Sequence, residues 1–147
     1  MVGAPVDPHV AELLAGRGLV SDGSRARQLD RAALHRAALV VVMSRAQRAA
    51  VVSVEPSAVR RTVLLGRLGR QLSRAGSGLP GATPAERLDA LPGWLARART
   101  AGPAAADDEI GDPYGRAGSV HTEVFGRIED AIGLFGRALV PETGGSA

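Results

Sequence analysis

The pattern of apolar positions predicts an α/β fold. Residues 39–43 form an unbroken apolar run rich in β-branched side chains, typical of a strand buried on both faces in a parallel sheet covered by helices. A second, shorter strand is expected at residues 62–65. Asp7, Asp30 and Ser44 each precede a helical pattern and suit its N-cap. The resulting order is helix, helix, strand, helix, strand.

The second half of the chain is predicted to be mainly helical. Residues 73–106 are rich in glycine and proline and are expected to form a partly helical insertion, interrupted at Pro92 and Gly93. A last helix is expected to begin after Ser119 as its cap. Its predicted apolar face comprises Val124, Ile128, Ala131, Ile132, Phe135 and Leu139.

The buried strand at 39–43 needs a neighbour on each side, but the chain offers one other strand. A sheet of two parallel strands is marginal, and its open edges invite pairing with other chains. We therefore expect residues 1–147 to form a single incomplete domain. It would be a three-layer parallel sheet with flanking helices, truncated at the N-terminus to about two strands. Self-association through the exposed strand edge is expected as well.

Composition narrows the chemistry. A chain of 147 residues suits one domain. It contains no cysteine, which excludes disulfides, cysteine-ligated zinc and a thiol nucleophile within these residues. It contains no lysine, which excludes a Walker-type phosphate loop and Schiff-base chemistry. The first residues carry no basic region followed by an apolar one, and no apolar run is long enough to span a membrane, so the expected location is the cytoplasm.

Several weak motifs have simpler explanations. Residues 76–81 match the spacing G-x-G-x-x-G but follow a helical pattern instead of a strand, so a loop is expected. His9, His35 and His121 are far apart along the chain and lack a second ligand four residues on, so no metal site is predicted. No cofactor is predicted. The 18 basic residues, all arginine, are dispersed, and the net charge is only +3, so no nucleic-acid partner is expected.

The most informative polar motif is residues 112–115, Asp-Pro-Tyr-Gly, just before the last helix. Pro113 fixes its own backbone and biases Asp112 toward an extended conformation. A carboxylic acid held in this way could protonate a leaving oxygen, with the Tyr114 ring beside it. The alternative is an ordinary Asp-Pro turn without a catalytic role. The four-residue motif, taken by itself, favours this alternative.

The chain resembles the low-molecular-weight protein tyrosine phosphatases over most of its length. The matching stretches, in the family's order, are residues 3–8 (GAPVDP), 23–29 (GSRARQL), 38–45 (ALVVVMSR) and 108–115 (DEIGDPYG). Ser24 stands where the family often has histidine. The insertion at 73–106 resembles one in actinobacterial members, and an all-arginine composition suits a GC-rich genome.

The resemblance implies a role for two residues. Asp112 matches the family's general acid, which protonates the departing phenol, and Tyr114 matches the aromatic residue that lines the phosphotyrosine slot. The family's nucleophile is a cysteine in a C-x5-R loop between the first strand and the first helix. The present chain has no cysteine and begins after the family's second strand.

Three functions stay open. The first is a low-molecular-weight phosphatase whose chain is inactive as it stands because the cysteine loop is missing; with that loop present its substrate would be a phosphotyrosine protein or an aryl phosphate. The second is a non-catalytic pseudophosphatase that acts as a protein-binding module. Its exposed strand could pair with a strand of the partner. The third is a basic nucleic-acid binder, whose affinity would depend steeply on salt. Whether the chain is an enzyme therefore stays open at this stage.

Overall fold

In the computed structural model no helix of the described part is long and apolar enough to cross a membrane. The described residues are 2–21, 23–75, 79–98 and 105–140.

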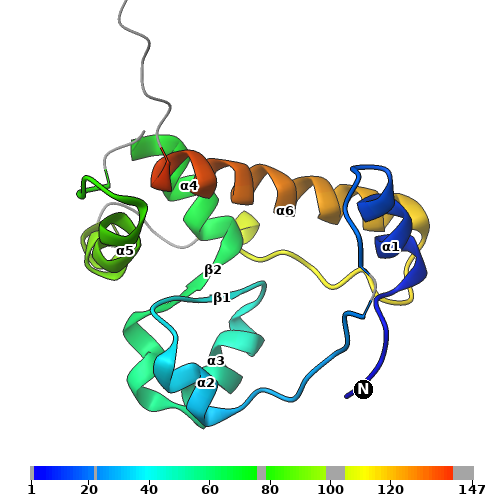
Figure 1. The fold of residues 1–147 in the computed structure, drawn as a ribbon, viewed down its shortest axis with the longest axis horizontal. Coiled ribbons are helices and arrows are strands. Elements are labelled where there is room, and N and C mark those ends of the chain that lie inside the picture. The colour runs from blue at the N-terminus through cyan, green and yellow to red at the C-terminus, as the bar shows by residue number, and fades with distance from the viewer. Residues whose placement is uncertain (1, 22, 76–78, 99–104, 141–147) are drawn as a thin grey trace, which may run out of the picture.

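A small parallel sheet lies at the centre of the molecule (Figure 1). Strand β1 (Val40–Val42) pairs with β2 (Thr62–Leu64), with Val40 opposite Thr62. Both strands lie where the apolar runs predict them, and the α/β class is confirmed. The helix α3 (Arg45–Val54) joins the two strands as the crossover that parallel pairing requires.

One face of the sheet is covered by short helices, below the strands in Figure 1. These are α2 (Arg31–Arg36), α3 and the 3₁₀ turn η1 (Pro56–Arg60). The N-caps of α2 and α3 are those predicted, because Asp30 accepts hydrogen bonds from two backbone N–H groups and Ser44 from one. The core on this side is formed by Leu34, Val42, Val51, Ala58 and Leu64.

Longer helices cover β2 on the other face. Helix α4 (Leu65–Ala75) begins directly where β2 ends, α5 (Pro84–Ala98) lies beside it, and α6 (Gly118–Leu139) runs along the top of the molecule in Figure 1. This core is the largest and includes Val63, Leu68, Leu72, Leu79, Leu91, Leu95 and Ala138.

Helix α1 (Pro8–Ala15) lies at the far end of α6, away from the sheet (Figure 1). Asp7 is its N-cap, as predicted. The two helices are joined by Arg17, whose Nε lies 2.6 Å from Glu129 Oε1 and whose Nη2 lies 2.8 Å from Oε2. The same guanidinium lies 4.4 Å from the centre of the Phe125 ring. Arg17, just after the end of α1, therefore holds this helix against the middle of α6.

The structure corrects two predictions about burial. Residues 39–43 were expected to be buried on both faces, but Val41 is 38% exposed. Val41 is paired with Val63, so their side chains lie on the same face of the sheet. On that face the described residues of α4, α5 and α6 cover Val63 of β2 and leave Val41 exposed. Ile132, expected on the apolar face of the last helix, is 54% exposed.

Two predicted helix boundaries are also wrong. Helix α5 passes through Pro92 without interruption. Proline lacks an N–H, so the turn loses one hydrogen bond, but Leu91 and Leu95 are buried on either side and their packing holds the helix. Helix α6 begins at Gly118, with Ala117 as an N-cap that makes no side-chain hydrogen bond, so Ser119 is inside the first turn. The G-x-G-x-x-G stretch lies partly outside the described residues, and the insertion at 73–106 stays a prediction.

Candidate functional site

The loop that carries Asp112 leaves the sheet at the carboxyl end of β1. The backbone N–H of Ile110 donates to the carbonyl of Met43, just after β1, at 2.9 Å. Ile110 itself is 2% exposed. Ligand sites of open parallel sheets lie at the carboxyl ends of the strands, so this loop starts where an α/β site is expected.

A buried ion pair anchors the same loop. Asp108, in the 3₁₀ turn η3 (Ala106–Asp108), is fully buried. Its Oδ1 accepts from Arg70 Nε at 2.8 Å, and its Oδ2 accepts from Arg70 Nη2 at 3.0 Å and from the Ala105 N–H at 3.0 Å. Both oxygens are therefore satisfied, as a buried carboxylate requires.

The predicted site residues Asp112 and Tyr114 lie together at the end of this loop. Asp112 is exposed, and its Oδ1 accepts a hydrogen bond from the Tyr114 N–H at 3.0 Å. The Tyr114 side chain is 71% exposed. The Asp-Pro turn is thus formed, and it holds the carboxyl group outward at the surface. The catalytic roles that the resemblance implies for these two residues stay predictions.

A pocket of about 400 Å³ opens beside this turn. Asp112 and Tyr114 contribute to one wall, while Asp7 and His121 contribute polar groups from α1 and α6. The remaining surface is largely apolar, with Val10, Val124, Phe125 and Ile128. An apolar pocket with a few polar groups is suited to a small organic ligand.

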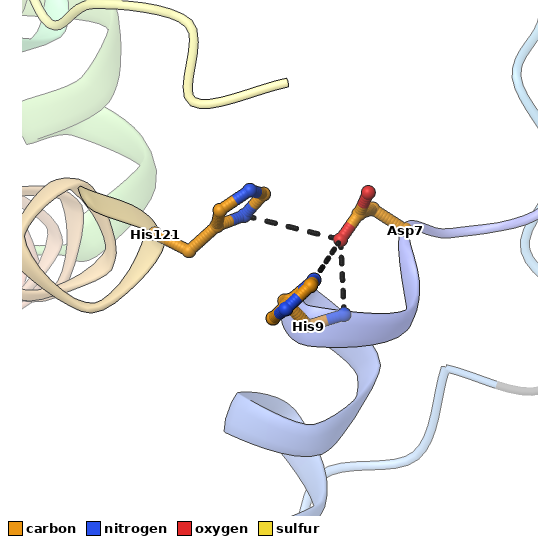
Figure 2. A group of neighbouring side chains, drawn as sticks. All are labelled: Asp7, His9 and His121. Carbon is orange, nitrogen blue, oxygen red and sulfur yellow. Dashed lines mark hydrogen bonds and ion pairs between the residues drawn. The ribbon is translucent and has the colours of Figure 1, made fainter. Parts of the chain in front are cut away.

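Figure 2 shows three ligand-type side chains that converge, Asp7, His9 and His121, and two of them, Asp7 and His121, line this pocket. The His9 and His121 rings are stacked, with centroids 4.9 Å apart. Spacing along the chain predicts no metal site, because the three histidines are far apart in the sequence. No local signal links residues on two different helices, so the cluster was found only in three dimensions. His35 lies apart from it on α2.

The anion-binding end of α3 is already occupied. Helix α3 follows β1 directly, a position suited to phosphate binding. The Arg45 N–H at its start donates to Glu109 Oε1 at 2.7 Å, and the Arg45 guanidinium pairs with the same carboxylate. Within the described residues, the Glu109 carboxylate therefore takes the place that a phosphate would use.

Four arginines gather at a separate, smaller pocket of about 160 Å³. Sequence analysis expected dispersed arginine, so this local clustering is new. Two of the four already have partners: Arg45 pairs with Glu109, and Arg48 Nη2 donates to the Val59 carbonyl at 3.1 Å. That no nucleic acid binds stays a prediction. The four residues are Arg45, Arg48, Arg60 and Arg67.

No protein-family model and no curated protein matches the chain. Comparison with solved structures finds tyrosine phosphatases. The tyrosine phosphatase AmsI of Erwinia amylovora superposes with a TM-score of 0.66 at 20% identity, over 95% of this chain and 69% of AmsI. Wzb of Vibrio vulnificus, in complex with benzylphosphonate, superposes with a TM-score of 0.60 at 18% identity, over 92% of this chain and 69% of Wzb.

A third solved protein tyrosine phosphatase superposes with a TM-score of 0.64 at 18% identity, over 97% of this chain and 72% of that protein. These likenesses extend over 92–97% of the chain. The chain therefore has the α/β fold of the low-molecular-weight tyrosine phosphatases.

Proposed function

We propose that the chain is part of a low-molecular-weight protein tyrosine phosphatase in which Asp112 is the general acid. The observation that supports this most is the position of the Asp112-Pro113-Tyr114 turn. It follows a buried residue anchored at the carboxyl end of β1, in a fold shared with three tyrosine phosphatases.

Asp112 is suited to the role by its chemistry. Phenolate is a poor leaving group, since the pKa of a phenol is about 10, and a carboxylic acid that protonates the departing oxygen removes this difficulty. The backbone at Pro113 and the hydrogen bond from the Tyr114 N–H hold the carboxyl group in place. Tyr114 would form one wall of the slot for the phosphotyrosine ring.

The 147 residues do not complete the reaction alone. Phosphoryl transfer in this family uses a thiolate, and the chain holds no cysteine. The start of α3, which could bind a phosphate, is occupied by Glu109. We therefore expect hydrolysis only when a strand, C-x5-R loop, helix and strand precede these residues. The substrate would be a phosphotyrosine protein or an aryl phosphate, and the compartment the cytoplasm.

A graft tests this proposal. A strand–loop–helix–strand unit with a C-x5-R loop is fused before residue 2, and p-nitrophenyl phosphate hydrolysis is measured for the fusion and for the chain alone. We expect turnover from the fusion and none from the chain alone. Asp112→Asn in the fusion should lower kcat by about 10²–10⁴-fold. Asp89→Asn, an exposed carboxylate on α5, is the control and should leave kcat unchanged. Thiol-independent turnover by the chain alone would overturn the proposal.

A pseudophosphatase that binds a protein is the second candidate, and the exposure of Val41 favours it. Val41 is the central residue of β1, and a further parallel strand beside it would extend the sheet. The two candidate functions predict different coding sequence upstream of Met1. An in-frame C-x5-R coding segment upstream of Met1 supports the phosphatase, whereas its absence there supports the binding protein.

A further inference from the structure

Two histidines and an aspartate from separate helices point at one another beside the pocket (Figure 2). Asp7 is the N-cap of α1, His9 is the second residue of that helix, and His121 lies in the first turn of α6. Asp7 Oδ1 lies 3.6 Å from His9 Nδ1 and 3.9 Å from His121 Nδ1. One ligand atom from each residue lies within 4.8 Å of the other two.

His121 is the unusual member of the group. The residue is 4% exposed, and its Nδ1 has no hydrogen-bond partner among the described residues. The Asp7 oxygen at 3.9 Å is too distant for a hydrogen bond. A buried imidazole nitrogen without a partner is costly. Its Nδ1 and the Asp7 carboxylate nevertheless face each other, an arrangement that a cation between them would satisfy.

We propose that Asp7, His9 and His121 bind a divalent transition-metal ion of the zinc type. Two imidazoles and one carboxylate, without a thiolate, suit Zn²⁺ and its neighbours, whereas Ca²⁺ and Mg²⁺ prefer sites made only of oxygen ligands. In a four-coordinate site with bonds of about 2.0–2.1 Å, neighbouring ligand atoms lie about 3.3 Å apart. The two distances to Asp7 Oδ1 exceed this by less than 1 Å.

The surroundings hold two of the ligands and leave a way in. Asp7 Oδ1 is oriented by the N–H of His9, which donates to it at 2.9 Å. The His9 ring lies against Gly118, where a Cβ would come within 3.4 Å of its Cδ2. The His9 side chain is 54% exposed, so an ion can reach the site from solvent.

The site would also link two parts of the fold. A bound ion would join the start of α1 to the start of α6, at the same end of the molecule as the Arg17–Glu129 pair. Three protein ligands leave a fourth position for water, and Asp7 and His121 line the pocket that Asp112 also lines. The binding does not depend on phosphoryl transfer, so this inference and the proposed function can fail separately.

Titration of the 147-residue chain with ZnCl₂ by calorimetry tests the site. We expect one Zn²⁺ to bind per chain and Mg²⁺ not to bind. His9→Gln removes an exposed ligand without disturbing the core and should weaken Zn²⁺ binding by about tenfold or more. His35→Gln removes the one histidine outside the cluster, which is exposed on α2, and should bind as the unchanged chain does.

Histidine ring resonances in the NMR spectrum provide a second readout that does not rely on a variant of the buried residue. On addition of Zn²⁺ the signals of His9 and His121 should shift together while those of His35 stay in place. Zn²⁺ binding should also raise the melting temperature of the unchanged chain and not that of His9→Gln. Equal affinity of His9→Gln and the unchanged chain, equal weakening by His35→Gln, or shifts confined to His35 would each overturn the proposal.

Discussion

The Asp108–Arg70 ion pair anchors the loop that carries Asp112. Asp108 lies four residues before Asp112 and is fully buried. Both of its carboxylate oxygens pair with Arg70. Asp108→Asn leaves the Arg70 charge without its partner, and we expect unfolding to become easier by about 3 kcal/mol. Asp107→Asn, an exposed neighbour, should change stability by less than about 0.5 kcal/mol. Urea denaturation measures both, and equal stability of the two variants would contradict this account of the loop.

The Glu55 carboxyl makes the stability of the folded protein depend on pH. Hydrogen bonds from Ser57 and then from Arg31 lower its pKa from 4.5 to about 2. The folded state therefore binds this proton less readily than the unfolded state. The stabilisation is complete above the unfolded pKa and is lost as pH falls from about 4.5 toward 2.

Glu55→Gln should accordingly lower stability at pH 7 and flatten its decline between pH 5 and pH 3. The midpoint of urea denaturation, measured at intervals over that range, shows the slope. Glu12→Gln, exposed on α1, is the matched control and should keep the slope of the unchanged chain. A slope that Glu55→Gln leaves intact would assign the acid sensitivity to another group.

At the scale of elements, α4 comes unusually close to the segment that carries Asp108. A Cβ at Gly66 would lie 2.7 Å from the Asp107 carbonyl oxygen and 2.8 Å from that of Asp108. Gly66→Ala should destabilise the protein by about 1–3 kcal/mol, because backbone must move. Gly136→Ala, where a Cβ meets open space within a helix, should stabilise by up to about 1 kcal/mol. Thermal unfolding compares the two, and a stabilising Gly66→Ala would disprove the close approach.

The elements that sequence analysis predicts correctly carry local signals. Asp7, Asp30 and Ser44 cap their helices as expected, because capping depends on a side chain and the two or three N–H groups that follow it. Helix α4 is the helix that the pattern before residue 76 indicates, but its start carries no local signal, since it begins directly from β2 with no capping residue between them. Pro92 was misread as an interruption because the packing that keeps α5 intact comes from distant residues.

Some residues of the candidate site likewise carry a local sequence signal, whereas others are brought together only by the fold. Asp112 and Tyr114 belong to one short motif and could be singled out from the sequence. The burial of Asp108 depends on Arg70, 38 positions away, and no pattern within the loop itself predicts this pair. The pairing of His9 with His121 depends on α1 packing against α6, which no spacing rule reveals.

At the scale of the whole molecule, the small sheet leaves Val41 exposed in the middle of β1. In the described sheet β1 is an edge strand. We expect the chain to self-associate as its concentration rises, since the backbone of an edge strand can pair with a strand of another chain. Val41→Lys should shift the equilibrium toward monomer, because a charge at this position opposes pairing. Val59→Lys, at a residue in η1 that is equally 38% exposed, is the control and should leave association unchanged. Sedimentation velocity over a range of concentrations distinguishes them, and a monomer at every concentration would contradict the expectation.

If Asp112 protonates the leaving group, as we propose, the effect of removing its acid should depend on the basicity of that leaving group. The fusion with a C-x5-R unit is assayed with phenyl phosphate, whose phenol has a pKa of about 10, and with 2,4-dinitrophenyl phosphate, whose phenolate needs no proton. We expect Asp112→Asn to slow the first substrate by about 10²-fold or more and the second by far less. Equal losses for both substrates would mean that Asp112 only supports the structure of the loop.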